Sequence, residues 1–223
     1  GWPTAPRRCA WSGVARIGES VLVSGYSLFE GQSTTTVRGP NLQRYAVAWP
    51  LRCKSEPKGL SGMSGAATPP AIRPHAFGAS RSGTLFSIGQ LCDETPAAEV
   101  WAKDSETPRI LELGELVAKM AYSVELLQGR GDEVFVDVGE KQPILAWRGD
   151  AFVALPKPPR PHESAFVSTE GDLHLALEDA IVRLEGDRWV EVGRLVWPAT
   201  FQSIAVEGGS FWVTTDRGLH ELQ

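Results

Sequence analysis

The sequence predicts an all-β protein built from repeated units of about 40 residues, on two observations. Five segments share a pattern in which one or two turn residues precede a short apolar or aromatic strand. Most of these segments are followed by a second pair of β-rich runs with a glycine between them, as in a hairpin. Few segments show helical periodicity, and the range 114–120 fits at most one or two helical turns.

The five strand segments become evenly spaced toward the C-terminus. Counted from the third residue of each segment, the intervals are 64, 49, 39 and 38 residues. A repeat of about 40 residues that contains four short strands has the size of one β-propeller blade. The five segments are Glu19–Val23, Gly83–Ser87, Asp132–Val136, Gly171–Leu175 and Gly209–Val213.

The other strands of each unit follow from the same alignment. The hairpins at Ala146–Leu155 and Arg183–Val192 align without a gap, 37 residues apart. The first unit shows a similar pattern at Leu28–Val37, and the second has a looser one at Val100–Leu113. A further strand precedes the five-residue segments, for example at Phe201–Val206. Each unit is therefore predicted to contain four strands.

The two ends of the chain predict that the ring closes. The fifth unit stops after its third strand, Gly218–Leu222, and the segment Gly1–Ala10 precedes the first unit. We predict that Trp2–Arg8 supplies the missing outer strand, where Pro3 and Pro6 are tolerated because an edge strand can spare backbone donors. The expected architecture is a single β-propeller domain over residues 1–223. It has about five four-stranded blades, closed by the N-terminal strand, and a β-sandwich with ordinary hairpins is the alternative.

The last unit resembles a known repeat. Glu207, Gly208 and Gly209 precede an aromatic strand that contains Trp212, and the Gly218-Leu219 step follows. This pattern resembles the propeller repeats in the sensor domains of bacterial two-component regulators. The resemblance implies a bacterial propeller, but such repeats recur in propellers of unrelated function.

Composition excludes several classes of partner. The net charge is −5 and no basic face is evident, so we expect no nucleic-acid binding. No apolar run approaches the roughly 18 residues that cross a membrane, so we expect no membrane insertion. Catalytic signatures such as GxSxG and HExxH are absent from the sequence. We expect a monomer with no cofactor.

The cysteines bear on metal binding and on the compartment. Cys9, Cys53 and Cys92 are an odd number without a CxxC pair, which does not favour a zinc site. Either one disulfide with a free thiol or three reduced thiols fits this count. In an exported protein we expect Cys53–Cys92 to be the pair, because both lie in loop-like sequence. The sequence fixes no compartment, and our preference is for a bacterial periplasmic or secreted protein.

Irregular sequence gathers in the links between units, and two links end alike. The first link, taken as 42–74, is long and rich in glycine, serine, alanine and proline, and another link is Pro156–Pro161. Arg73-Pro74-His75 and Arg160-Pro161-His162 each precede a predicted inner strand. Links in a propeller open on one face, so this repetition predicts a binding site for an anionic or hydroxyl-rich ligand. The alternative is a purely structural role, in which proline sets the angle at which the chain enters the strand and each histidine packs or faces water.

Three more residues are assigned to the same predicted face. Trp49, with Arg44 and Tyr45 beside the long first link, could stack on a sugar or anchor a partner, although core or interblade packing is the favoured reading of this tryptophan. The predicted ligand-binding set is therefore Arg73, His75, Arg160, His162, Arg44, Tyr45 and Trp49, with no metal ligand and no catalytic residue.

Two functions fit these observations. The first is a non-catalytic binding module that presents a protein- or carbohydrate-binding face at the loop-rich end of the propeller. The alternative is a small hydrolase or lyase that acts on a carbohydrate or lactone at the channel mouth, with His75 and His162 as acid and base. Convergence of titratable side chains in a shielded pocket would favour the enzyme, whereas a broad exposed face would favour the binding module.

Overall fold

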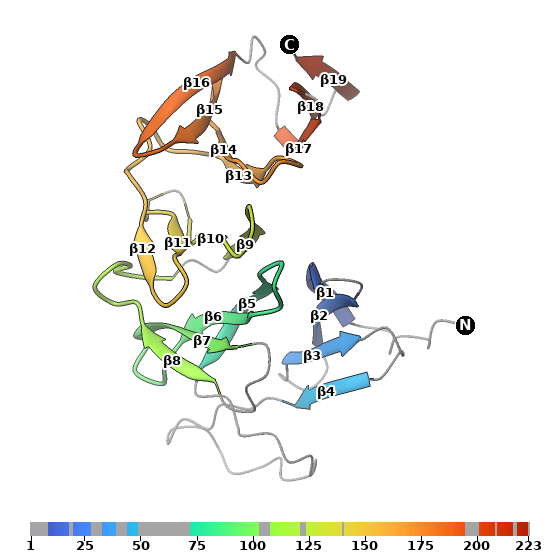
Figure 1. Ribbon diagram of the computed structural model, residues 1–223, viewed down its shortest axis with the longest axis vertical. Helices are drawn as coiled ribbons and strands as arrows, with labels where there is room; N and C mark the ends of the chain where they lie inside the picture. Colours follow the sequence, from blue (N-terminus) through green and yellow to red (C-terminus); the bar gives the residue numbers. More distant parts are fainter. Residues whose placement is uncertain are drawn as a thin grey trace. The chain divides into compact units, whose positions relative to one another are not determined.

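In the computed structural model most of the described residues form short antiparallel strands, and no helix occurs among them. They form four four-stranded sheets and one three-stranded sheet (Figure 1). Below residue 72 the description covers the backbone alone. The described residues are 9–17, 20–27, 33–38, 44–48, 72–102, 108–120, 124–139, 141–194, 201–207, 209–215 and 218–222.

The chain divides into two compact units, and residues 1–124 hold two of the sheets. In both sheets each strand pairs with the next one along the chain. The first strands of the two sheets, β1 and β5, lie beside each other. The first sheet contains β1 (Cys9–Ile17), β2 (Ser20–Ser27), β3 (Ser33–Arg38) and β4 (Arg44–Ala48). The second contains β5 (Arg73–Ala79), β6 (Leu85–Gln90), β7 (Pro96–Trp101) and β8 (Arg109–Glu112).

Residues 125–223 form the second unit, with three sheets of the same simple order. The first is β9 (Glu125–Gln128), β10 (Val134–Asp137), β11 (Leu145–Trp147) and β12 (Phe152–Ala154). The next is β13 (Ser164–Val167), β14 (Leu173–Ala176), β15 (Ala180–Glu185) and β16 (Arg188–Arg194). The last is β17 (Phe201–Glu207), β18 (Ser210–Thr215) and β19 (Gly218–Leu222). β13 lies beside both β9 and β17, so the first strands of successive sheets are neighbours, as in blades around an axis.

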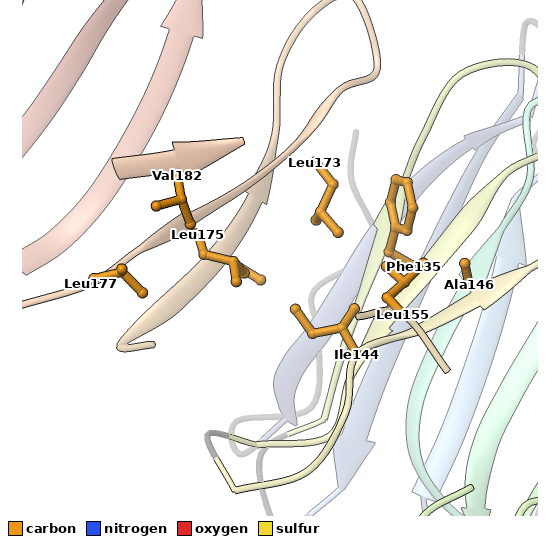
Figure 2. Packing of buried hydrophobic residues seen from close by; sticks show 9 residues of the cluster. Phe135, Ile144, Ala146, Leu155, Leu173, Leu175, Leu177 and Val182 are labelled. Carbon is orange, nitrogen blue, oxygen red and sulfur yellow. The ribbon is translucent and has the colours of Figure 1, made fainter. Parts of the chain in front are cut away.

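Side chains from two successive sheets pack together in the second unit. Phe135, Ile144 and Leu155 come from the β9–β12 sheet and its flanking residues, and Leu173 and Leu175 come from β14 (Figure 2). All five are less than 9% exposed. Burying an aliphatic or aromatic side chain of this size contributes about 1.5–3 kcal/mol, so this apolar layer holds the two sheets together.

The five repeated segments were predicted correctly. They fall on β2, β6, β10, β14 and β18, each of which is the second strand of its sheet. The aligned hairpins at Ala146–Leu155 and Arg183–Val192 are third-to-fourth strand pairs, as expected. The range 114–120 contains one turn, closed by the hydrogen bond from Val117 N to Leu113 O.

The alignment of the first unit was wrong. Thr34–Val37 belongs to β3, which pairs with both β2 and β4, so it is a third strand and not a fourth. The fourth strand, Arg44–Ala48, lies inside the range 42–74 that was predicted as a loop. Two of its five residues are alanine and only Val47 is β-branched, which is a weak strand signal.

The N-terminal segment proposed to close the ring, Trp2–Arg8, lies outside the described residues. β19, its predicted partner, pairs with β18. Cys92 is disulfide-bonded, so its partner is one of the other two cysteines, Cys9 and Cys53.

Candidate binding face

Connections in the second unit alternate between the two ends of each antiparallel sheet. We call one end the link end: it holds the start of β9 and the connections 138–144, 155–163 and 177–179. The other is the turn end, with the hairpin turns 129–133, 148–151, 168–172 and 186–187. The predicted triplet Arg160-Pro161-His162 therefore lies at the link end, just before β13.

His162 is sealed inside the link end. Its side chain is 2% exposed, and its Nε2 lies 3.0 Å from Asp137 Oδ2, at the end of β10. The other oxygen of Asp137 accepts a hydrogen bond of 2.8 Å from Gly139 N. Both carboxylate oxygens are thus occupied, and Nε2 donates to an acceptor on a different sheet. The Nδ1 atom of His162 is buried without a hydrogen-bond partner among the described residues.

A second carboxylate lies across from this pair. Glu125, the first residue of β9, is the register partner of Asp137 on β10. Desolvation and the nearby Asp137 charge raise the pKa of Glu125, while the charge of His162 acts in the opposite direction. Like charges at opposed positions destabilise a sheet, and a raised pKa on one partner relieves the repulsion.

Arg160 and Asp179 form the exposed part of the link end. Arg160 Nη1 lies 2.6 Å from Asp179 Oδ1, and their side chains are 48% and 60% exposed. An ion pair this exposed contributes between about 0 and 1 kcal/mol, so a ligand could replace either partner at little cost. Asp179 lies between β14 and β15, on the connection that faces the same end as the link.

The other predicted triplet is placed differently. Arg73, Pro74 and His75 begin β5 instead of preceding it, and a bulge leaves His75 without a register partner on β6. His75 Nε2 lies 3.3 Å from Gln90 Oε1, on the same sheet. Equal triplets therefore make unequal contacts, since His75 pairs within its sheet whereas His162 reaches a neighbouring one. The two triplets also belong to different units of the chain.

The remaining predicted residues lie in or near the first sheet. Arg44 and Tyr45 are on β4, where the backbone alone is described, and Arg73 is likewise described by its backbone. Trp49 lies outside the described residues. Among the described residues, no group of three or more His, Cys, Asp or Glu side chains could hold a metal ion.

Sequence reasoning missed Asp137, Glu125 and Asp179 as members of this face. The sequence does carry a signal for one of them: Asp137 directly follows the apolar strand Val134–Val136, at a position where two other units have Ile88 and Ala176. A charge at that repeat position marks a departure from the apolar layer. Glu125 and Asp179 can be assigned to this face only when the strand register and the placement of the connections are known.

The turn end carries a clamp between two sheets. Arg130 Nε donates to Glu170 O at 3.2 Å, and Arg130 Nη2 lies 3.1 Å from Asp172 Oδ1. Gly171 packs so closely on Arg130 that a Cβ at residue 171 would lie 2.6 Å from Arg130 N. Arg148, in the next turn along, pairs with Glu133. The contacts of Arg130 and Gly171 join the two sheets at this end.

Comparison with known proteins identifies the fold. No protein-family model matches the chain, and no curated protein matches it. Virginiamycin B lyase from Staphylococcus aureus is similar in structure, with a TM-score of 0.58 at 11% identity, over 95% of this chain and 69% of the lyase. The Aleuria aurantia lectin, a six-bladed β-propeller, has a TM-score of 0.50 at 16% identity, over 94% of this chain and 74% of the lectin. The fold is that of a β-propeller.

A third solved structure extends the comparison. A prolyl endopeptidase matches with a TM-score of 0.56 at 11% identity, and the match covers 96% of this chain but 34% of the endopeptidase. These neighbours include a lectin and two enzymes, so the propeller fold itself favours neither binding nor catalysis. Within the described residues no helix is long and apolar enough to cross a membrane.

Proposed function

We propose that this propeller is a non-catalytic binding module that holds a protein or carbohydrate ligand at the link end of residues 125–223. The burial of His162 carries the proposal. A general acid or base must come within hydrogen-bond reach of its substrate, whereas this imidazole is 2% exposed and its Nε2 is already held by Asp137. The histidine fixes the link, whereas the side chains of Arg160 and Asp179 are exposed and can meet a ligand.

The proposal includes the predicted ring. We propose that the five sheets are the blades of one monomeric domain, and that Trp2–Arg8 pairs with β19 as the outer strand of the last blade. The simple strand order in every sheet and the neighbouring first strands within each unit support this reading. We also propose that Arg44, Tyr45, Trp49, Arg73 and His75 contribute to the same face of the ring.

The test is a binding measurement with a matched pair of variants. Purified protein is applied to a glycan array and to candidate partner domains, and Arg160→Ala is compared with Arg148→Ala. The two arginines are similarly exposed, 48% and 51%, and each pairs with a carboxylate, but Arg148 lies at the turn end. We expect Arg160→Ala to weaken binding and Arg148→Ala to preserve it. Equal binding by both variants would place the ligand elsewhere.

A hydrolase or lyase is the second candidate, and the pairing of Glu125 with Asp137 is the observation that favours it. Two carboxyl groups in unequal environments can divide the roles of acid and base. Asp137 is held by two donors, whereas the pKa of Glu125 is raised by burial and by Asp137. This enzyme would use Glu125 as the acid in place of His75 or His162. Loss of turnover of a carbohydrate or lactone in Glu125→Gln, with folding intact, would establish it.

A further inference from the structure

The link between β12 and β13 has a second feature beyond its exposed charge. Four of its six residues are proline, in the run Pro156-Lys157-Pro158-Pro159-Arg160-Pro161, which we call the proline strap. Proline fixes its own φ near −65° and drives the preceding residue toward extended conformations. The prolines therefore hold the backbone to a fixed course, which bends at Pro159 and Arg160, so binding the strap costs little conformational entropy.

Hydrogen bonds from side chains and backbone hold the strap at its start and just past its end. At its start, Trp189 Nε1 donates to Pro156 O at 2.8 Å. Just past its end, His162 Nε2 donates to Asp137 Oδ2 at 3.0 Å, and Glu163 N donates to Ala176 O at 2.8 Å. These bonds fix where the strap enters and leaves, so its middle is presented at a defined place.

The middle of the strap faces solvent. Lys157, Pro159, Arg160 and Pro161 are exposed, while Pro156 and Pro158 are half-buried. The accessible surface thus combines two proline rings with two cationic side chains. Arg160 forms an exposed ion pair with Asp179, which costs little to break.

We propose that the proline strap is the docking site for a protein domain that reads polyproline segments in an aromatic groove with acidic residues at its rim. This inference rests on the proposed function, because it names the partner of the same link end. Aromatic grooves bind extended proline segments by packing against the rings. The acidic rim follows from Lys157 and Arg160.

The chemistry of the strap favours a protein over a carbohydrate. Proline has no N–H and its ring has no polar atom, so the exposed rings of Pro159 and Pro161 offer no donor to sugar hydroxyls. Its rings instead offer apolar surface at low entropic cost, which is what an aromatic groove uses. A carbohydrate ligand would depend on Arg160 and Asp179 and would be indifferent to the rings of Pro159 and Pro161.

The experiment presents the full chain to a panel of purified polyproline-binding domains of the SH3, WW and EVH1 types and measures Kd by biolayer interferometry. We expect at least one domain to bind, and the double variant Pro159→Ala/Pro161→Ala to bind about tenfold more weakly, as for loss of an anchor residue. The control is Pro143→Ala, which removes a half-buried proline from another connection at the link end. Thermal melts establish that the variants fold. The charge reversal Lys157→Glu provides a second variant, also expected to weaken binding about tenfold if the rim is acidic.

Two results would overturn the inference: no domain of the panel binds the full chain, or the double variant binds as tightly as the parent. The glycan array separates this failure from that of the proposed function. Glycan binding that Arg160→Ala abolishes and that the double proline variant retains would uphold the proposed function and remove the strap as the docking site. If neither domains nor glycans bind, both proposals fall.

Discussion

Replacing Gly171 with alanine tests the contact that joins two sheets at the turn end. Gly171 has a φ of 93°, and an added Cβ would lie 2.6 Å from Arg130 N and 2.8 Å from Arg130 Cα. Both obstructing atoms are backbone, so relief requires the β9–β10 turn to move. That movement would also strain the hydrogen bonds from Arg130 to Glu170 O and Asp172 Oδ1.

The size of the effect has two parts. An alanine at positive φ costs about 1–2 kcal/mol. Overpacking against a fixed neighbour costs about 1–3 kcal/mol more. We therefore expect Gly171→Ala to lower the free energy of unfolding by about 2–5 kcal/mol.

Gly149→Ala is the matched control. Its φ of 84° is close to that of Gly171, but no atom lies within 4 Å of its added Cβ. It should lose only the conformational part, about 1–2 kcal/mol. Urea unfolding followed by tryptophan fluorescence measures both variants. If the two differ by less than about 0.5 kcal/mol, which is the usual scatter of surface substitutions, the sheets do not meet at Gly171 and the clamp is wrong.

Four further predictions concern pH, closure and redox state. Burial lowers the pKa of His174, so the folded protein should lose stability as pH falls below the unfolded value of 6.5, and His174→Phe should reduce that pH dependence in urea titrations. The pKa of Glu125 is raised above 4.5, so the free energy of unfolding should decrease as pH rises through the pKa of the folded state. A Glu125→Gln variant that is less stable than the parent at neutral pH would contradict this. Deleting residues 1–8 should expose β19 and promote aggregation; a variant that stays monomeric with an unchanged melting temperature argues against closure. Non-reducing mass spectrometry of exported protein should find Cys92 joined to Cys53, and a Cys9–Cys92 peptide would redirect that pairing.

The repeat could be predicted from the sequence because the second strand of each sheet has a recognisable residue pattern. Turn residues followed by alternating apolar and aromatic residues occur at β10, β14 and β18 with nearly equal spacing. The aligned hairpins succeeded for the same reason, since a glycine at positive φ, such as Gly149 or Gly186, is both a sequence signal and a backbone requirement. β4 failed because a short alanine-containing strand has no such signal.

The candidate site was only partly readable. The sequence placed Arg160 and His162 at a link, and the structure puts them there, yet they do different things: one is exposed and the other is sealed by Asp137. Burial and partner choice depend on which neighbouring sheet a side chain meets, and no pattern within a repeat contains that information. Asp137 and Glu125 were missed because cross-strand register pairs residues that lie twelve positions apart in the chain.

His174 illustrates the same limit inside the core. It occupies the position of Phe86 and Phe135 in the repeat, stacking on Phe166 with 5.3 Å between ring centroids and meeting Phe211 edge-on at 5.7 Å. The sequence shows a single histidine in this strand, but it does not predict that the ring packs between aromatic side chains of two sheets. Its Nδ1 lies 2.9 Å from Asp172 O, so the ring is also tied to the turn end.

The hydrogen bonds at the two ends of the proline strap determine which of its residues can be replaced. The bonds that define its course involve the Pro156 carbonyl, the His162 ring and the Glu163 amide, all at or beyond the margins of the run. Residues 157–161 can therefore be exchanged with the loss of one exposed ion pair, Arg160 with Asp179, while the bonds at the margins remain. Substitutions in the strap can therefore change which ligand is bound without changing the packing of the sheets.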